Sequence, residues 1–134
     1  MSSSERTPRI RRSGVPDDAL IVLRGDDLRP ATARHQAEVF RRRYPDWGRW
    51  GLSAFYARNE LEVDDLAADQ LERFPMIDLY EASDLRAAAF EIVPTFRTPH
   101  LTLAFSGDLD EGIGRLRRAV HQARPNPYNF LGRS

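Results

Sequence analysis

The chain of 134 residues contains no cysteine and no lysine. The absence of cysteine excludes a disulfide framework, a cysteine-ligated zinc site and a thiol nucleophile. It is also typical of a reducing compartment, so we expect a cytoplasmic protein. No apolar run approaches the length of roughly 18 residues that a membrane-spanning helix needs. The charged N-terminus lacks the apolar stretch of a secretory signal.

Several catalytic and nucleotide-binding motifs are also missing, among them H-E-x-x-H, Walker A, G-x-G-x-x-G and G-x-S-x-G. Three aspartates, Asp64, Asp65 and Asp69, lie on one predicted helix opposite its apolar stripe, so we interpret them as a solvated face. We therefore predict no metal site and no cofactor.

All 20 basic residues are arginine, and they balance 20 acidic residues. Together with abundant alanine and aspartate, this bias is typical of high-GC bacterial genomes. Arginine still binds carboxylate and phosphate bidentately. The charge is segregated, because residues 1–14 carry four arginines against one acid while residues 59–85 carry nine acids against one arginine. Such a pattern permits a polar partner, self-association or an intramolecular contact.

Length and composition predict one domain, since 41% hydrophobic residues suffice for a single core. Residues 1–15 are rich in Ser, Arg and Pro and show no periodicity. We interpret them as a flexible basic arm, either a solvated tail or an arm that binds nucleic acid. Residues 16–134 are predicted to form one globular domain.

The apolar pattern predicts both strands and helices in that domain. Short apolar or alternating runs predict strands at 19–23, 51–57, 76–80, 90–96 and 100–105. Helical spacing predicts helices at 30–44, 60–74, 83–89 and 109–120. The order β-α-β-α-β-α-β-β-α indicates an α+β or α/β fold, with a single mixed sheet of about five strands and three longer helices packed on it. In the remaining tail, Tyr128 and Phe130 are expected to pack back onto the core.

The stretch PTFRTPHLTLAF, residues 94–105, holds the first candidate site. In a strand with period two, His100 and Thr102 face one side, with Arg97 just outside the strand. A histidine transfers protons near neutral pH, and an arginine binds phosphate. We therefore predict His100, Arg97 and Thr102 as catalytic residues of metal-independent RNA cleavage. The alternative is a polar but inert sheet face.

That chemistry needs a second proton donor, for which the candidates are His35, His121, Glu91 and Tyr56. Substrate binding is assigned to Arg24, Arg73 and Ser53.

Arg24-Gly25 at the end of a buried strand, with Ser53 in GLSAFYA, resembles the first-strand arginine and second-motif serine of ADP-ribosyltransferases. The resemblance implies that Arg24 contacts NAD and that Glu91 supplies the catalytic glutamate. A structural alternative for Arg24 is an ion pair with Asp26 or Asp27.

Three functions therefore stay open. The phrases VPDDALIVLRG, PTFRTPH and RPNPY resemble a group of small proteins of high-GC bacteria, and this resemblance implies no activity. Size and composition are similar to those of toxins in toxin–antitoxin pairs, which favours an RNA-directed nuclease with RNA and a cognate antitoxin as partners. The second hypothesis is a non-catalytic interaction module that docks onto a partner protein through Trp47, Trp50 and the acidic helix predicted at 60–74. The third is the NAD-binding, ADP-ribosyltransferase-like protein.

Overall fold

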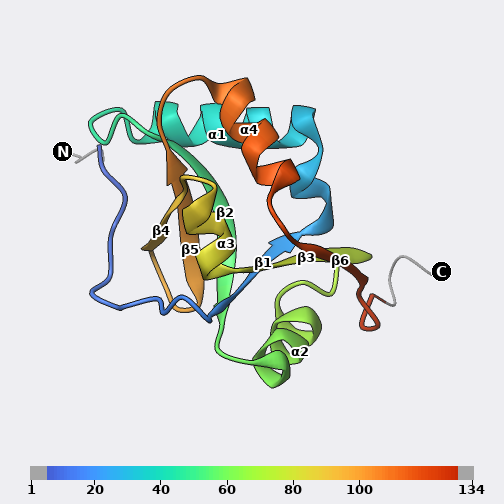
Figure 1. The fold of residues 1–134 in the computed structure, drawn as a ribbon. Coiled ribbons are helices and arrows are strands. Elements are labelled where there is room, and N and C mark those ends of the chain that lie inside the picture. The colour runs from blue at the N-terminus through green and yellow to red at the C-terminus, as the bar shows by residue number, and fades with distance from the viewer. Residues whose placement is uncertain (1–5, 130–134) are drawn as a thin grey trace.

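A computed structural model describes residues 6–129 of the chain. It has one sheet with the strand order β4-β5-β2-β1-β3-β6, and each neighbouring pair is antiparallel (Figure 1). The strands are β1 (Leu20–Arg24), β2 (Trp50–Ala57), β3 (Met76–Glu81), β4 (Glu91–Pro94), β5 (His100–Phe105) and β6 (Gln122–Pro125). The helices are the 3-10 turn η1 (Gly25–Leu28), α1 (Pro30–Arg43), α2 (Glu60–Asp69), α3 (Ala82–Ala87) and α4 (Leu109–Arg118).

The α+β class predicted from the sequence is confirmed. The sheet is antiparallel where a mixed sheet was expected, and it has one strand more than predicted. The additional strand is β6, which pairs with β3 at the sheet edge. Its sequence, QARP, lacks the β-branched and aromatic residues that mark strands. Pro125 is tolerated there because one side of an edge strand has no ladder partner.

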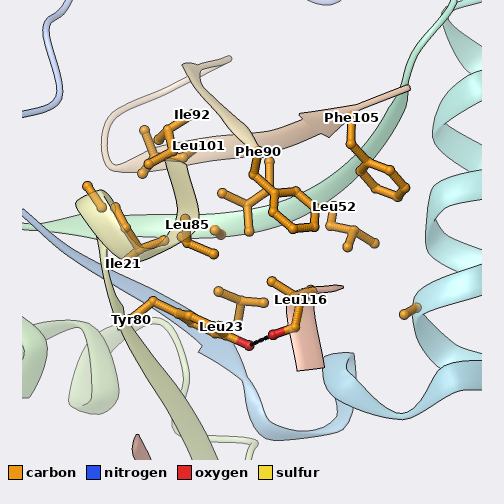
Figure 2. Packing of buried hydrophobic residues seen from close by; sticks show 14 of the residues in the cluster. Ile21, Leu23, Leu52, Tyr80, Leu85, Phe90, Ile92, Leu101, Phe105 and Leu116 are labelled. Atoms are coloured by element: carbon orange, nitrogen blue, oxygen red, sulfur yellow. Dashed lines mark hydrogen bonds between the residues drawn. The ribbon is translucent and has the colours of Figure 1, made fainter. Parts of the chain in front are cut away.

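The sheet has two different faces. Helices α1, α3 and α4 pack on one of them, which we call the sealed face, and α2 packs on the other, which we call the open face (Figure 1). The larger core lies on the sealed face and includes Leu52, Leu85, Leu103 and Phe105. Figure 2 shows this core, in which the Tyr80 hydroxyl donates a hydrogen bond of 2.8 Å to the Leu116 carbonyl. The smaller core lies between α2 and β1, β2 and β3.

The centre of the sheet opens between β1 and β2. These strands pair only where Leu20–Val22 face Ala57–Phe55. Beyond that point β1 continues along β3, whereas β2 continues along β5. Helix α1 packs against β2 in this region and brings the Phe40 ring onto Gly51. A Cβ atom at position 51 would lie 2.5 Å from that ring, so the approach requires glycine.

The helix boundaries follow local signals. Pro30 is the first residue of α1, where its missing N–H costs nothing. Asn59 caps α2, because its side chain accepts a hydrogen bond of 3.0 Å from the Glu62 N–H. Asp108 caps α4 in the same way.

Both ends of the described chain are tied to the body. Arg11 N–H donates to the Pro94 carbonyl at 2.8 Å, and Phe96 N–H donates to the Arg9 carbonyl at 3.0 Å. This segment, residues 6–15, is the described part of the predicted arm. After β6, the Tyr128 hydroxyl donates to Asp64 on α2. Phe130 lies outside the described residues.

Candidate functional site

Three strands place polar side chains on the open face. On β1, Arg24 follows Val22 by two residues and so lies on the same face as Val22, which belongs to the core under α2. On β2, Ser53 lies two residues before Phe55 and shares its face, and Phe55 packs against the same core. His100 lies opposite Phe55 in the β2–β5 register, and its ring centre is 5.8 Å from that of Phe55. Arg24, Ser53 and His100 therefore share one face of the sheet.

A chain of hydrogen bonds links Ser53 and His100 to two threonine side chains, Thr95 and Thr102. The His100 Nε2 atom lies 3.1 Å from the Ser53 hydroxyl, and Nδ1 lies 2.9 Å from the Thr95 hydroxyl. Thr95 continues the chain to Thr102 at 2.7 Å. Thr95 and Thr102 are fully buried, while Ser53 and His100 are half-buried. The chain thus runs from the interior towards Ser53 at the surface.

The surroundings of His100 favour its neutral form. Burial is the largest influence and lowers the pKa of His100, and the positive charges of Arg11 and Arg24 lower it further. A hydrogen bond with the backbone of Thr95 partly opposes this lowering of the pKa. A neutral imidazole at neutral pH can accept a proton, so His100 is suited to act as a base.

Arg24 is held by a carboxylate and an aromatic ring. Its Nε donates to Asp27 Oδ2 at 3.0 Å, and its guanidinium carbon lies 5.4 Å from the centre of the Phe74 ring. Asp27 is buried, which raises the pKa of Asp27, and the charge of Arg24 opposes that rise. The structural alternative for Arg24, an ion pair with Asp27, is confirmed. The remaining guanidinium nitrogens of Arg24 are directed to no other described side chain.

An open cavity of about 450 Å³ adjoins Arg24 and Asp27, but its lining does not include Ser53 or His100. It is lined by Arg24, Asp26, Asp27, Thr32, His35, Gln36, Val39 and Phe74. Gln36 connects the cavity with the hydrogen-bonded chain, because its side-chain oxygen accepts the backbone N–H of Ser53. His35 is exposed on the wall of the same cavity. Arg24 and His35 therefore line the same cavity, whereas His100 is not among its lining residues.

Several predicted residues do not join this group. Arg97 is exposed in the turn before β5, and Arg73 is exposed after α2; neither lines the cavity. Glu91 lies on the edge strand β4, where it pairs with Arg49. Thr102 reaches His100 only through Thr95.

Sequence reasoning missed Thr95, Gln36 and Arg11. Arg11 donates to the His100 carbonyl at 2.6 Å and to the Thr98 hydroxyl at 2.9 Å. Gln36 and Arg11 come from segments far from His100 in sequence, so no local sequence pattern indicates that they lie near it. Thr95 carried a weak signal, because it lies in the same short stretch as His100.

The residues of the docking hypothesis are largely engaged within the chain. The indole N–H of Trp50 donates to the Gly107 carbonyl at 2.9 Å, and the Arg41 guanidinium lies 4.3 Å above its ring. The ring of Trp47 packs against that of Phe40, with 5.7 Å between the ring centres. On α2, Glu60 pairs with Arg124 and Glu62 with Arg58. These contacts explain the two tryptophans and much of the acidic helix as parts of the fold.

Within residues 6–129 no cluster of three histidine or acidic side chains is arranged to hold a metal ion. No helix in that range is both long and apolar enough to cross a membrane. Comparison with protein-family models, curated proteins and solved structures finds no match to the chain.

Proposed function

We propose that this protein is a small cytoplasmic phosphate-handling enzyme that cleaves RNA without a metal ion. The observation that supports the proposal is the 3.1 Å contact between Ser53 and His100 on the sheet face that also carries Arg24, and Arg24 lines an open cavity. This arrangement combines a neutral base, a hydroxyl and a phosphate-binding cation. Arg24 takes the role that the sequence assigned to Arg97.

The reaction would proceed by proton transfer at two positions. The ribose 2′-oxygen attacks phosphorus, and its proton passes through the Ser53 hydroxyl to Nε2 of His100. The bond from phosphorus to the 5′-oxygen breaks, and His35 would donate a proton to the leaving oxygen. Arg24 stabilises the negative charge that develops on the phosphorane. The products are a 2′,3′-cyclic phosphate and a free 5′-hydroxyl.

Thr95 and Thr102 act as positioning residues in this scheme. The Thr95 hydroxyl bonds Nδ1 of His100 and thereby holds the ring towards Ser53. Thr102 fixes Thr95 in turn. Neither threonine is accessible to a substrate, because both are fully buried.

The test compares RNA cleavage by the purified wild type and by Arg24→Ala, with product ends identified by mass spectrometry. We expect a loss of about 100-fold, as for removal of one transition-state donor. Arg73→Ala is the matched control, because Arg73 is exposed and lies off the cavity. Since Arg24 also pairs with Asp27, Arg24→Lys tests whether the charge suffices and guards against misfolding. Cleavage that is equal in wild type, Arg24→Ala and His100→Ala would refute the proposal.

A toxin of this kind would need an inhibitor, and we extend the proposal to a cognate antitoxin that covers the cavity. Acidic side chains would suit the exposed nitrogens of Arg24. Co-purification with the protein encoded next to it, followed by recovery of cleavage after the complex is separated, would support this partner.

NAD-dependent ADP-ribosyl transfer is the second candidate. It is favoured by the placement of Arg24 and Ser53 on neighbouring strands and on one face of the sheet, with Arg24 lining the cavity. The Phe74 ring in that cavity offers a surface on which an aromatic base could stack. Glu91 does not supply the carboxylate, because it is paired with Arg49 at the sheet edge. Calorimetric titration with NAD tests this candidate: heat that disappears in Arg24→Ala supports it, and no heat with the wild type rejects it.

A further inference from the structure

A second open cavity of about 570 Å³ lies on the other side of η1. Its lining residues are Gly25, Leu28, Arg29, Pro30, Gly114, Arg117, Arg118 and His121. In Figure 1 the C-terminal end of α4 lies near η1 and the start of α1, and these segments form the walls. The turn η1 separates the two cavities, because Asp26 and Asp27 line the first while Gly25 and Leu28 line the second.

The charge of this cavity is of one sign. Its described lining contains three guanidinium groups and an imidazole, and no carboxylate. Within residues 6–129, Arg117 and Arg118 have no ion pair and are exposed. Arg115 on the same helix is different, because it pairs with Glu111 and donates to the Ala88 carbonyl. Arg29 has only a long contact of 3.6 Å with Asp26.

His121 forms a fixed part of the wall. Its ring stacks on Tyr80 with 4.8 Å between ring centres, and Nδ1 donates to the Ala119 carbonyl at 2.7 Å. The other ring nitrogen, Nε2, lies 4.0 Å from the buried carboxylate of Asp78. The lining of the cavity includes His121 but not Asp78.

Gly114 allows Arg118 to lie close to the surface of α4. A Cβ atom at position 114 would be 2.9 Å from Nη1 of Arg118 and 3.7 Å from its guanidinium carbon. The bare backbone at Gly114 thus lets the planar guanidinium fold back along the helix at the cavity wall. Any larger residue would push the group away from this position.

We propose that this cavity binds a small anion bearing phosphate groups, of the size of inorganic pyrophosphate. Arg117 and Arg118 would bind it from α4, with Arg29 on the facing wall. Guanidinium groups bind phosphate oxygens through two parallel hydrogen bonds, and the volume lies in the range of small-ligand sites. The inference goes beyond the proposed nuclease, because it uses different residues and a different cavity.

The experiment is a calorimetric titration with inorganic pyrophosphate at low ionic strength. We expect the double variant Arg117→Ala/Arg118→Ala to bind at least about tenfold more weakly, since hydrogen bonds between charged groups are lost. The matched control is Arg42→Ala/Arg43→Ala, which removes two adjacent exposed arginines of α1 outside the cavity. The control should stay within about twofold of the wild type, because screened charges at a distance contribute little. Gly114→Ala should weaken binding by a smaller factor than the double variant.

Four results would overturn the proposal. The first is no pyrophosphate binding by the wild type, and the second is an equal loss in both double variants, which would indicate only net charge. The third is binding that Arg24→Ala abolishes, because the phosphate would then occupy the first cavity. The fourth is binding of a short single-stranded RNA, dependent on Arg117 and Arg118, without any binding of pyrophosphate. Pyrophosphate binding retained in Arg24→Ala, together with lost RNA cleavage, would support both proposals separately.

Discussion

The two faces of the sheet use buried groups differently. The sealed face carries a continuous apolar core, and the Tyr80 hydroxyl within it is bonded to a backbone carbonyl. On the open face, the apolar core under α2 draws no residue from β4 or β5. There the sheet carries the chain of hydroxyls and imidazole from Thr102 to Ser53. The comparison shows that the larger apolar core lies on one face, whereas the polar side chains of the candidate site gather on the other.

The largest effect should follow from a cavity in the sealed face. Leu103 is completely buried and belongs to the core that α1, α3 and α4 form with the sheet. We expect Leu103→Ala to lower the free energy of unfolding by about 3 kcal/mol, through lost burial and the cavity left behind. Denaturant unfolding measures the change, and Leu61→Ala serves as the control because Leu61 is 71% exposed. Equal unfolding midpoints for the two variants would contradict the division between the faces.

A smaller loss of stability should follow from breaking the chain of hydrogen bonds that runs from Thr102 to Ser53 on the open face. Thr102→Val keeps the shape of the side chain but removes the buried bond to Thr95. We expect a loss of about 1–2 kcal/mol in the free energy of unfolding, as for other buried hydrogen bonds. In a double-mutant cycle with Thr95→Val, the combined loss should be smaller than the sum of the single losses. Strict additivity would show that the two hydroxyls do not act as a pair.

The smallest effect concerns pH. Because the pKa of His100 is lowered in the folded state, the unfolded chain binds a proton at higher pH than the native protein does. Above the unfolded pKa of about 6.5 both states are neutral at this site, and the residue has no effect. As the pH falls below that value, the free energy of unfolding decreases until the folded-state pKa is passed.

The measurement for this effect is denaturant unfolding between pH 7.5 and 5, compared with His100→Gln; these pH limits bracket a window of roughly one to two units around the unfolded pKa. The difference between the two proteins isolates His100 from other titrating groups. Asp27 and Asp78 act in the opposite direction, because burial raises the pKa of each and protonation at low pH relieves that cost. If the free energy of unfolding of the wild type rose relative to that of His100→Gln as the pH fell, the result would contradict the environment described for His100.

Local sequence patterns predicted most of the elements but only part of the site. The alternation in GLSAFYA and HLTLAF correctly placed Ser53 and His100 on faces opposite the main core. That the two side chains meet depends on the β2–β5 register, which pairs Ser53 with Thr102 and Phe55 with His100 and so makes Ser53 and His100 diagonal neighbours, although they are 47 positions apart in sequence. No local pattern specifies such a register.

Arg97 shows the limit in another way. Its position beside His100 in the sequence suggested a shared site, but the turn between β4 and β5 leaves its side chain exposed. Arg24, which is far away in sequence, is brought to the same face by the position of β1 beside β2. Neighbours across a sheet are determined by topology, and a single sequence states topology only indirectly.

The N-terminal segment has a practical consequence for anyone preparing this protein. Ile10 pairs with Thr95, Arg9 and Arg11 bond the backbone of the β4–β5 turn, and Arg11 also bonds the His100 carbonyl. A shortened version that starts at residue 16 would lose all of these contacts. The turn that carries Thr95 and precedes His100 would then lack its outer support, so such a truncation is a poor specimen for functional assays.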